Sequence, residues 1–283
     1  MSTCLITGGA SGIGLQCGIE FLEVNENNKL SIVDYFIPFQ VENDLIKKFG
    51  QKKIIFIRAD VTDHQQIYNA FKETVFQFGR LDYVLNNAGV GLKEQVITSD
   101  EQDLIKSFER LQKVININLT AVIRVTMIAI QFMNQLKSKG HIINVSSMGG
   151  LLPQGDAAVY SATKHGVIGF SRSLVYLQKE YGIRVNTLCP SFVETPMIVK
   201  NLMEVTGKKI NPGELVQLGI AMHPHAIAKA FIELYHDKDI NGEVLTIGRG
   251  GALVRIPTEE EMHQFKEKIK IITKQQLTPK PKL

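Results

Sequence analysis

Short apolar segments alternate along the chain with longer segments in which apolar and polar residues are mixed. The short segments are rich in β-branched residues, which is typical of strands buried on both faces of a sheet. Seven of them predict strands, at residues 3–7, 30–33, 53–58, 81–85, 141–145, 183–188 and 243–247. Strands that alternate with helices imply right-handed crossovers, so the pattern predicts an α/β fold with one doubly wound parallel sheet and helices on both faces.

The longer segments predict helices at residues 13–24, from Thr62 or Asp63 to 78, 99–136 and 160–180. Two stretches fall outside the alternation. Residues 191–222 contain Pro196 and Pro212 and have little strand character, and a charged tail follows residue 251. No segment rich in Pro, Gly or Ser divides the chain, which favours one domain over 1–250 and a separate tail over 251–283.

Composition narrows the class of protein. Of the 283 residues, 44% are hydrophobic and 21% are charged, and a net charge of +4 is too small to predict nucleic-acid binding. The three cysteines show no CxxC spacing, so neither a disulfide framework nor a zinc site is expected. The chain starts with an apolar strand and no basic leader, and Arg124 interrupts its most apolar run, 119–133. We therefore expect a soluble cytoplasmic protein that does not span a membrane.

The end of the chain bears on this location. Residues 281–283, Pro-Lys-Leu, approach a peroxisomal address, but proline replaces its small first residue. The cytoplasm therefore remains the expected compartment, with the peroxisome as the alternative.

The first strand leads into GGASGIG at residues 8–14, and a helical pattern follows. Gly8 and Gly12 allow a tight turn close to a pyrophosphate, Gly14 allows close packing of the helix, and the helix N-terminus offers amides to the phosphates. Asp34 ends the second strand 20 positions after Gly14, where a carboxylate binds the ribose of NAD and repels the extra phosphate of NADP. The alternative is an aspartate that only ends a strand. The pattern predicts a dinucleotide site that prefers NAD.

Tyr160 and Lys164 are four residues apart in a predicted helix, so their side chains share one face. A neighbouring ammonium lowers the pKa of a phenol, which makes the pair a candidate proton donor and acceptor. Ser147, 13 positions earlier, could hold a substrate oxygen. On its own this spacing is common and also fits an ordinary surface helix. Asn116 and Asn118 lie amid apolar residues, where a buried amide needs a partner and one of the two is a candidate functional residue.

Together these motifs resemble those of the short-chain dehydrogenase/reductase family, over residues 3 to about 250. The glycine motif of the family matches 7–14, and its NNAG motif matches 86–89. Its catalytic serine matches Ser147, and its YxxxK motif matches Tyr160 and Lys164. The order and spacing of the motifs are those of the family, which implies a Rossmann-like domain.

Other positions refine this resemblance. The helix asparagine of the family falls on Asn118, and its CPG segment falls on Cys189-Pro190. Segments 78–90, 159–173 and 240–247 are similar to the branch of the family that oxidises prostaglandin hydroxyl groups with NAD. Two positions depart from that branch. Ser191 replaces a glycine near the nicotinamide, and Ala157 stands where the branch has a substrate-contacting glutamine, which leaves the substrate open.

The resemblance implies hydride transfer between a secondary alcohol and NAD, without a metal. Tyr160 would exchange the hydroxyl proton, while Lys164 would lower the pKa of Tyr160 and hold the nicotinamide ribose. Ser147 would orient the substrate oxygen, and Asn118 would place a water in the proton path. The cofactor contacts implied in this way are Gly8, Gly12, Ile13, Gly14, Asp34, Tyr35, Ala59, Asp60, Val61, Asn87, Tyr160, Lys164 and 193–195, the last including Val193 and Thr195.

Residues 191–222 follow the sixth strand, at the sheet edge where α/β folds bind ligands. Their apolar side chains, such as Met197, Ile198 and Met203, predict a lid over a lipophilic alcohol: a hydroxy fatty acid, a prostaglandin-like molecule or a steroid. A loop that covers ordinary core is the alternative. Lys208 and Lys209 could meet a substrate carboxylate, although a solvated pair is favoured.

Two other functions remain as alternatives. One is a carbonyl reductase that uses NADPH, against which Asp34 argues. The other is a regulator that binds a dinucleotide without turnover, against which Ser147, Tyr160 and Lys164 argue. The resemblance also implies a homodimer or homotetramer formed through the two long helices. His223 and His225 flank Pro224 without a third ligand, so a structural role is favoured over a metal site.

Overall fold

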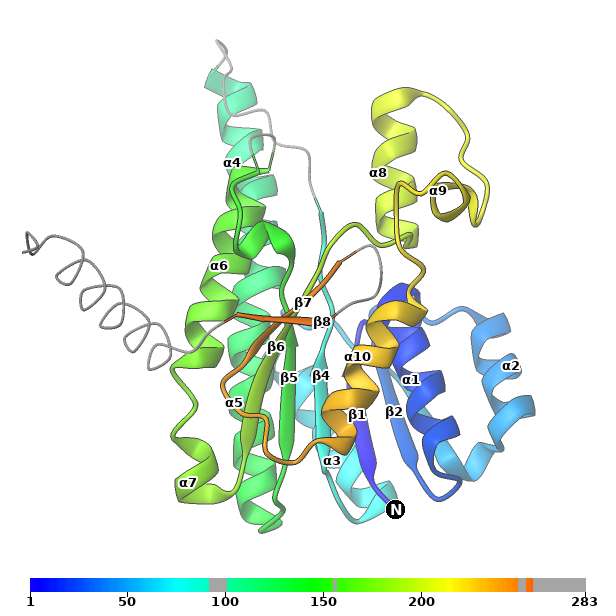
Figure 1. Cartoon of the computed structure of the whole chain (residues 1–283), viewed down its shortest axis with the longest axis vertical. Coiled ribbons are helices and arrows are strands. Elements are labelled where there is room, and N and C mark those ends of the chain that lie inside the picture. The colour runs from blue at the N-terminus through cyan, green and yellow to red at the C-terminus, as the bar shows by residue number, and fades with distance from the viewer. Residues whose placement is uncertain (92–100, 155–156, 249–252, 257–283) are drawn as a thin grey trace, which may run out of the picture.

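The centre of the molecule is an eight-stranded sheet in the order β3-β2-β1-β4-β5-β6-β7-β8 (Figure 1). The computed structural model describes residues 1–91, 101–154, 157–248 and 253–256. Its strands are β1 (Thr3–Thr7), β2 (Lys29–Asp34), β3 (Ile54–Arg58), β4 (Tyr83–Asn86), β5 (His141–Val145), β6 (Arg184–Pro190), β7 (Val244–Ile247) and β8 (Leu253–Ile256). All pairs from β3 to β7 are parallel. This arrangement confirms the predicted doubly wound parallel sheet.

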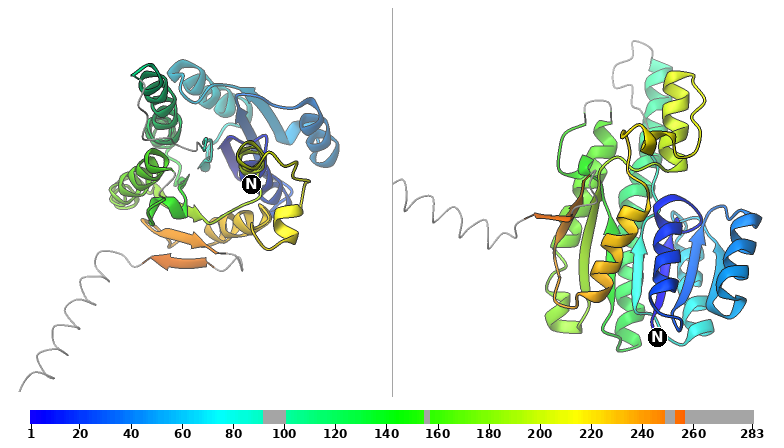
Figure 2. Two further views of the ribbon diagram at one scale, coloured as in Figure 1. Left: turned by 90° about the horizontal axis from the view of Figure 1, so that it is seen from above. Right: turned by 45° about the vertical axis from the view of Figure 1, so that its right-hand side comes forward.

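Helices cover both faces of this sheet (Figure 2). They are α1 (Gly12–Val24), α2 (Phe39–Phe49), α3 (His64–Phe78), α4 (Glu101–Ile115), α5 (Ala121–Gln135), α6 (Ala158–Arg172), α7 (Leu177–Tyr181), α8 (Pro196–Thr206), α9 (Glu214–Gln217) and α10 (His225–His236). On one face α1 packs on α10, where the ring centroids of Phe21 and Phe231 are 6.3 Å apart. On the other face α3 packs on α5, where those of Phe71 and Phe132 are 5.6 Å apart. Each face thus has its own aromatic core.

Local sequence explains where two of the helices begin and end. Asp63 caps α3, because its carboxylate accepts a hydrogen bond from the Gln66 amide at 2.9 Å. Thr195 caps α8 in the same way, and Pro196 occupies the first helical position, where its missing N–H costs nothing. Gly79 and Gly207 end these helices in the left-handed conformation that favours glycine.

The predicted helix over 99–136 is present as α4, a π-turn at Asn116–Thr120, and α5. Residues Gln102–Gln135 are long and apolar enough to cross a membrane by length and composition alone, a test that core helices also pass. The buried side chains of α5, among them Val125, Ala129 and Phe132, pack into the core beneath the sheet. Arg124 donates to the main-chain oxygens of Val61 and Thr62. These contacts describe a core helix.

Several elements differ from the prediction, and helices α8, α9 and α10 were not predicted. The helix expected over 160–180 ends at Arg172 and restarts at Leu177, because the amides of Leu174 and Leu177 bond three residues back, to the Ser171 and Leu174 carbonyls, instead of four. Helix α2 was missed because its apolar positions are sparse. The sheet also continues beyond the domain end expected at 250, since β8 pairs antiparallel with β7. The rest of the predicted tail, 257–283, lies outside the described residues.

Candidate active site

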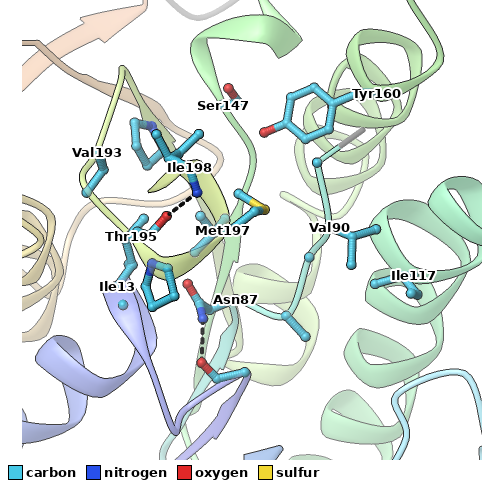
Figure 3. A pocket seen from close by; sticks show the side chains of 18 of the residues that line it. Ile13, Asn87, Val90, Ile117, Ser147, Tyr160, Val193, Thr195, Met197 and Ile198 are labelled. Atoms are coloured by element: carbon cyan, nitrogen blue, oxygen red, sulfur yellow. Dashed lines mark hydrogen bonds between the residues drawn. The ribbon is translucent and has the colours of Figure 1, made fainter. Parts of the chain in front are cut away.

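A cavity of about 830 Å³ opens at the carboxyl ends of the strands, where the strand order reverses between β1 and β4. Its lining includes every residue expected to bind the cofactor or to act in catalysis, except Gly14, Asn118 and Glu194. Figure 3 shows Ser147 and Tyr160 on one side of this cavity, with Ile13, Asn87 and Thr195 on the other. Residues distant in the sequence therefore meet in one site.

The glycine turn after β1 requires glycine for two different reasons. Gly8 and Gly12 have positive φ, at +64° and +53°, which disfavours any side chain. Gly14 is required for space, because a β-carbon there would lie 2.3 Å from the carbonyl oxygen of Gly8. Gly14 therefore lies beneath the cavity and shapes the turn without lining it.

The start of α1 is open to an anion. Ser11 precedes the helix and its side chain makes no capping hydrogen bond. Within the described part of the chain, the amides of Gly12, Ile13 and Gly14 have no protein acceptor. Free amides at a helix N-terminus carry a partial positive charge and suit a pyrophosphate.

Asn87 joins the glycine turn to the loop after β4. Its side-chain amide donates to the carbonyl oxygens of Thr7 at 3.3 Å and Gly8 at 2.9 Å. The Thr7 hydroxyl in turn accepts from the amides of Asn87 and Ala88. The two loops that flank the strand-order reversal are thus fixed to each other.

Asp34 is held in place at the end of β2. One carboxylate oxygen accepts from the Ala10 amide at 3.0 Å, and the other accepts from the Phe36 amide at 3.3 Å. The carboxylate lines the cavity beside Tyr35. Arg58, its register partner on β3, binds Glu42 and the Ile37 carbonyl.

The remaining expected cofactor contacts line the same cavity from three loops. Asp60 and Val61 follow β3, and the Asp60 carboxylate is anchored by the amide and the hydroxyl of Thr62. Val193 and Thr195 lie between β6 and α8, and the Thr195 side chain lies against Gly12. These loops complete the part of the cavity lining that was expected to contact the cofactor.

Tyr160 and Ser147 lie on the same side of the cavity (Figure 3). Their side chains share a hydrogen bond. Burial raises the pKa of Tyr160 above its usual value, and the hydrogen bond from Ser147 partly offsets that rise. In the protein alone, Lys164 therefore does not produce the lowered tyrosine pKa that the sequence predicted. Desolvation of the phenolate is the larger effect.

Lys164 lies one helical turn after Tyr160, and its ammonium is 5.7 Å from the centre of the Tyr160 ring. The side chain is buried and donates to the Val145 carbonyl at 3.0 Å. Burial lowers the pKa of Lys164 to about 8. A charge so close to titration, inside a cavity and beside a phenol, is typical of a functional site.

Asn118 is fully buried in the π-turn between α4 and α5. Its side chain accepts from the Val90 amide and donates to the Val90 carbonyl, both at 2.8 Å. The asparagine side chain therefore fixes the loop after β4. Gly89 in that loop separates the Asn118 side chain from the Lys164 ammonium.

The substrate side of the cavity is mainly apolar. Met197, Ile198 and Leu202 of α8 line it, whereas Lys208 and Lys209 do not. Sequence reasoning overlooked two neutral amides in this wall, those of Gln154 and Asn201. The position of Gln154, just before the helix that carries Tyr160, was the signal available for finding it.

No group of three or more His, Cys, Asp or Glu side chains within the described ranges is arranged to hold a metal ion. His225, considered above as part of a weak metal motif, instead contacts the Glu20 carboxylate at 2.7 Å. The structure therefore gives this histidine a structural contact between α10 and α1.

The cavity fits a nicotinamide dinucleotide. The glycine turn leaves space that β-carbons would fill, the start of α1 offers free amides, and Asp34 presents a carboxylate suited to ribose hydroxyls. Comparison with known proteins supports this interpretation. The family model described as short chain dehydrogenase matches residues 2–204. The chain belongs to the short-chain dehydrogenase family.

Relatives within this family share most of the chain. The mouse protein 15-hydroxyprostaglandin dehydrogenase [NAD(+)] is 33% identical, over 86% of this chain and 88% of its own length. The human protein of that name is 32% identical, over 86% of this chain and 89% of its own length. These matches agree with the prostaglandin-oxidising branch to which the sequence segments were similar. A 3-oxoacyl-[acyl-carrier-protein] reductase of Thermotoga maritima is 30% identical, over 87% and 96%.

Solved structures of short-chain dehydrogenases have the same fold. Levodione reductase superposes with a TM-score of 0.75 and 26% identity, covering 88% of this chain and 96% of its own. ElxO with NADP bound superposes with a TM-score of 0.71 and 27% identity, covering 88% and 98%. The chain is therefore a dinucleotide-binding oxidoreductase of this family.

Proposed function

We propose that the chain is an NAD-dependent dehydrogenase that oxidises a lipophilic secondary alcohol, such as a hydroxy fatty acid, a prostaglandin-like molecule or a steroid. One observation carries the proposal. The hydrogen-bonded hydroxyls of Ser147 and Tyr160 face the apolar side chains of α8 within a single cavity that Asp34 also lines. This arrangement places a proton acceptor beside an apolar binding surface.

A bound nicotinamide ring supplies hydride transfer to or from the carbinol carbon. Tyr160, as phenolate, takes the hydroxyl proton of the alcohol. Ser147 orients the reacting oxygen by hydrogen bonding, and Lys164 stabilises the phenolate by its charge. Since burial raises the pKa of Tyr160, alcohol oxidation should become faster as the pH rises above neutrality.

Asp34 supports the preference for NAD. A carboxylate at the end of β2 repels the extra phosphate of NADP, and the nearby Arg58 is engaged by Glu42. The name of the 33% identical relative, which specifies NAD(+), supports the same preference.

The experiment measures the formation of NADH or NADPH by the full chain with long-chain hydroxy acids, prostaglandins, steroids and short polyols. Each alcohol is tested with NAD and with NADP. We expect turnover of the long apolar alcohols with NAD. Turnover confined to small polar polyols would contradict the proposed substrate class, and a preference for NADP would contradict the proposed preference for NAD.

We also propose that two copies of the chain pair through α4 and α5. The support is an apolar group on α4 that faces solvent, in which Leu104, Ile105 and Phe108 are 40%, 53% and 61% exposed. Light scattering at micromolar concentration tests this, with a mass of two or four chains expected and the monomer mass contradicting it.

A further inference from the structure

Gln154 lies against the turn that holds Ser147. A β-carbon on Gly149 would lie 2.7 Å from the Oε1 atom of Gln154 and 3.2 Å from its Nε2 atom. The flat amide of Gln154 therefore lies directly over Gly149, and only glycine leaves room for it there. The Gly149 amide donates to the Ser147 hydroxyl at 3.0 Å. The Gln154 amide thus contacts the same residue, Gly149, that binds the Ser147 hydroxyl, the group that orients the reacting oxygen.

The Gln154 backbone is tied to the helix that carries Tyr160. Its carbonyl accepts from the Ala157 amide at 3.2 Å, immediately before α6. The Gly149 carbonyl accepts from the Ser161 hydroxyl at 2.6 Å. These contacts fix the segment that carries Gln154 between the turn at Ser147 and the start of α6.

The Gln154 side chain has no hydrogen-bond partner among the residues that the structure describes, although it lines the cavity. An amide offers two donors and an acceptor with two lone pairs. Apart from Asn201, the side chains that α8 presents to the cavity are apolar and offer no hydrogen bond. The group that it can bind is therefore a polar atom of the substrate.

We propose that Gln154 is a specificity-determining residue that hydrogen-bonds a second oxygen of the substrate, next to the carbinol carbon, with Gly149 providing the space. This inference rests on the proposed function and narrows its substrate class. The substrate is a lipophilic secondary alcohol that carries a hydroxyl or carbonyl group beside the reacting carbon. A site built to hydrogen-bond such a group discriminates against the analogue that lacks it.

The test compares a long-chain vicinal diol with the secondary mono-alcohol of the same chain length. The readout is the ratio of kcat/KM for the diol to that for the mono-alcohol, with NAD. We expect the ratio to fall about tenfold in Gln154→Met, which keeps the length of the side chain and removes its hydrogen bonds. Gln178→Met, an exposed glutamine on α7, should leave the ratio unchanged.

A second variant tests the role of Gly149. In Gly149→Ala the new methyl group displaces the Gln154 amide, so the ratio should fall as it does in Gln154→Met. The double variant should lose no more than either single variant, because both remove one interaction. Thermal shift on addition of NAD verifies that each variant still folds and binds the cofactor.

The outcomes separate this inference from the proposed function. No turnover of either alcohol by the unaltered chain would overturn the proposed function. Turnover of both with a ratio that neither variant changes would overturn the role of Gln154 and leave the dehydrogenase in place.

Discussion

On the dinucleotide side of the cavity, main-chain atoms and glycines determine the fit, whereas on the substrate side the fit depends on the side chains of α8. Gly8, Gly12 and Gly14 tolerate no other residue, for reasons of φ or of space. Met197 and Ile198, by contrast, are flexible or replaceable apolar groups. The comparison shows why a fold can keep its cofactor and change its substrate.

The largest effect is expected at Tyr160, whose hydroxyl group serves both the cofactor side and the substrate side of the cavity. Tyr160→Phe removes the proton acceptor and leaves the glycine turn intact, so turnover should fall about a thousandfold while NAD binding changes little. Steady-state rates and NAD titration by fluorescence measure the two quantities. Turnover like that of the unaltered chain would disprove the assignment of Tyr160.

Lys164→Met should separate catalysis from stability. Burial lowers the pKa of Lys164 to about 8 from a usual 10.5, so holding the charge costs about 3 kcal/mol at pH 7. Removing the charge therefore gains this free energy, and losing the hydrogen bond to the Val145 carbonyl takes back about 1 kcal/mol of it. The free energy of unfolding should therefore rise by about 2 kcal/mol while turnover is lost.

The pH dependence of this gain has a definite sign. Between about pH 8 and the usual pKa of lysine, the unfolded chain binds this proton and the folded chain does not. The unaltered chain thus becomes more stable as the pH rises through this range, and its difference from the variant shrinks. Urea unfolding at several pH values measures this, and a constant difference would contradict a charged, buried Lys164.

Asp34→Ala tests the dinucleotide side. Without the carboxylate, the ratio of kcat/KM for NADP to that for NAD should rise about tenfold, which corresponds to about 1.4 kcal/mol of removed repulsion. Asp44→Ala, an exposed carboxylate on α2, is the matched control. An unchanged ratio in Asp34→Ala would mean that the carboxylate does not meet the ribose.

Met197→Ala tests the substrate side and should have the smallest effect. Loss of part of the apolar contact is worth about 1 kcal/mol, so KM for a long-chain alcohol should rise about fivefold. Met203 lies on the same helix outside the cavity lining, and Met203→Ala should stay within about twofold. Equal effects in both variants would mean that α8 contributes only stability.

The same contrast explains what the sequence could predict. The glycine turn, Asp34, Tyr160 and Lys164 occupy positions where the backbone or the chemistry demands one residue type. Their spacing in the sequence is therefore enough to identify them. Gln154 was missed because nothing in its neighbours' sequence indicates that its amide lies over Gly149. The raised pKa of Tyr160 was also missed, since burial is a property of the packed molecule.

Whether a strand or helix could be predicted from the sequence depended on its length and on the residues beside it. The seven parallel strands are continuous apolar runs and were predicted to within a few residues. Strand β8 is short and adjoins a charged segment, so only its pairing with β7 identifies it. The π-turn that buries Asn118 cannot be read from a 3.6-residue period, because it interrupts that period.

The connection from β6 to β7, residues 191–243, contains α8 and begins and ends in strands that pair with each other. The entropy of closing a flexible loop grows only with the logarithm of its length, so doubling such a loop costs about 0.6 kcal/mol. Insertions in the loops of this connection, such as the loop between α8 and α9, therefore cost little for the folding of the chain, while an insertion between Gly8 and Gly14 would destroy the turn. New substrate preferences can arise in this connection by changes of loop length as well as by single substitutions.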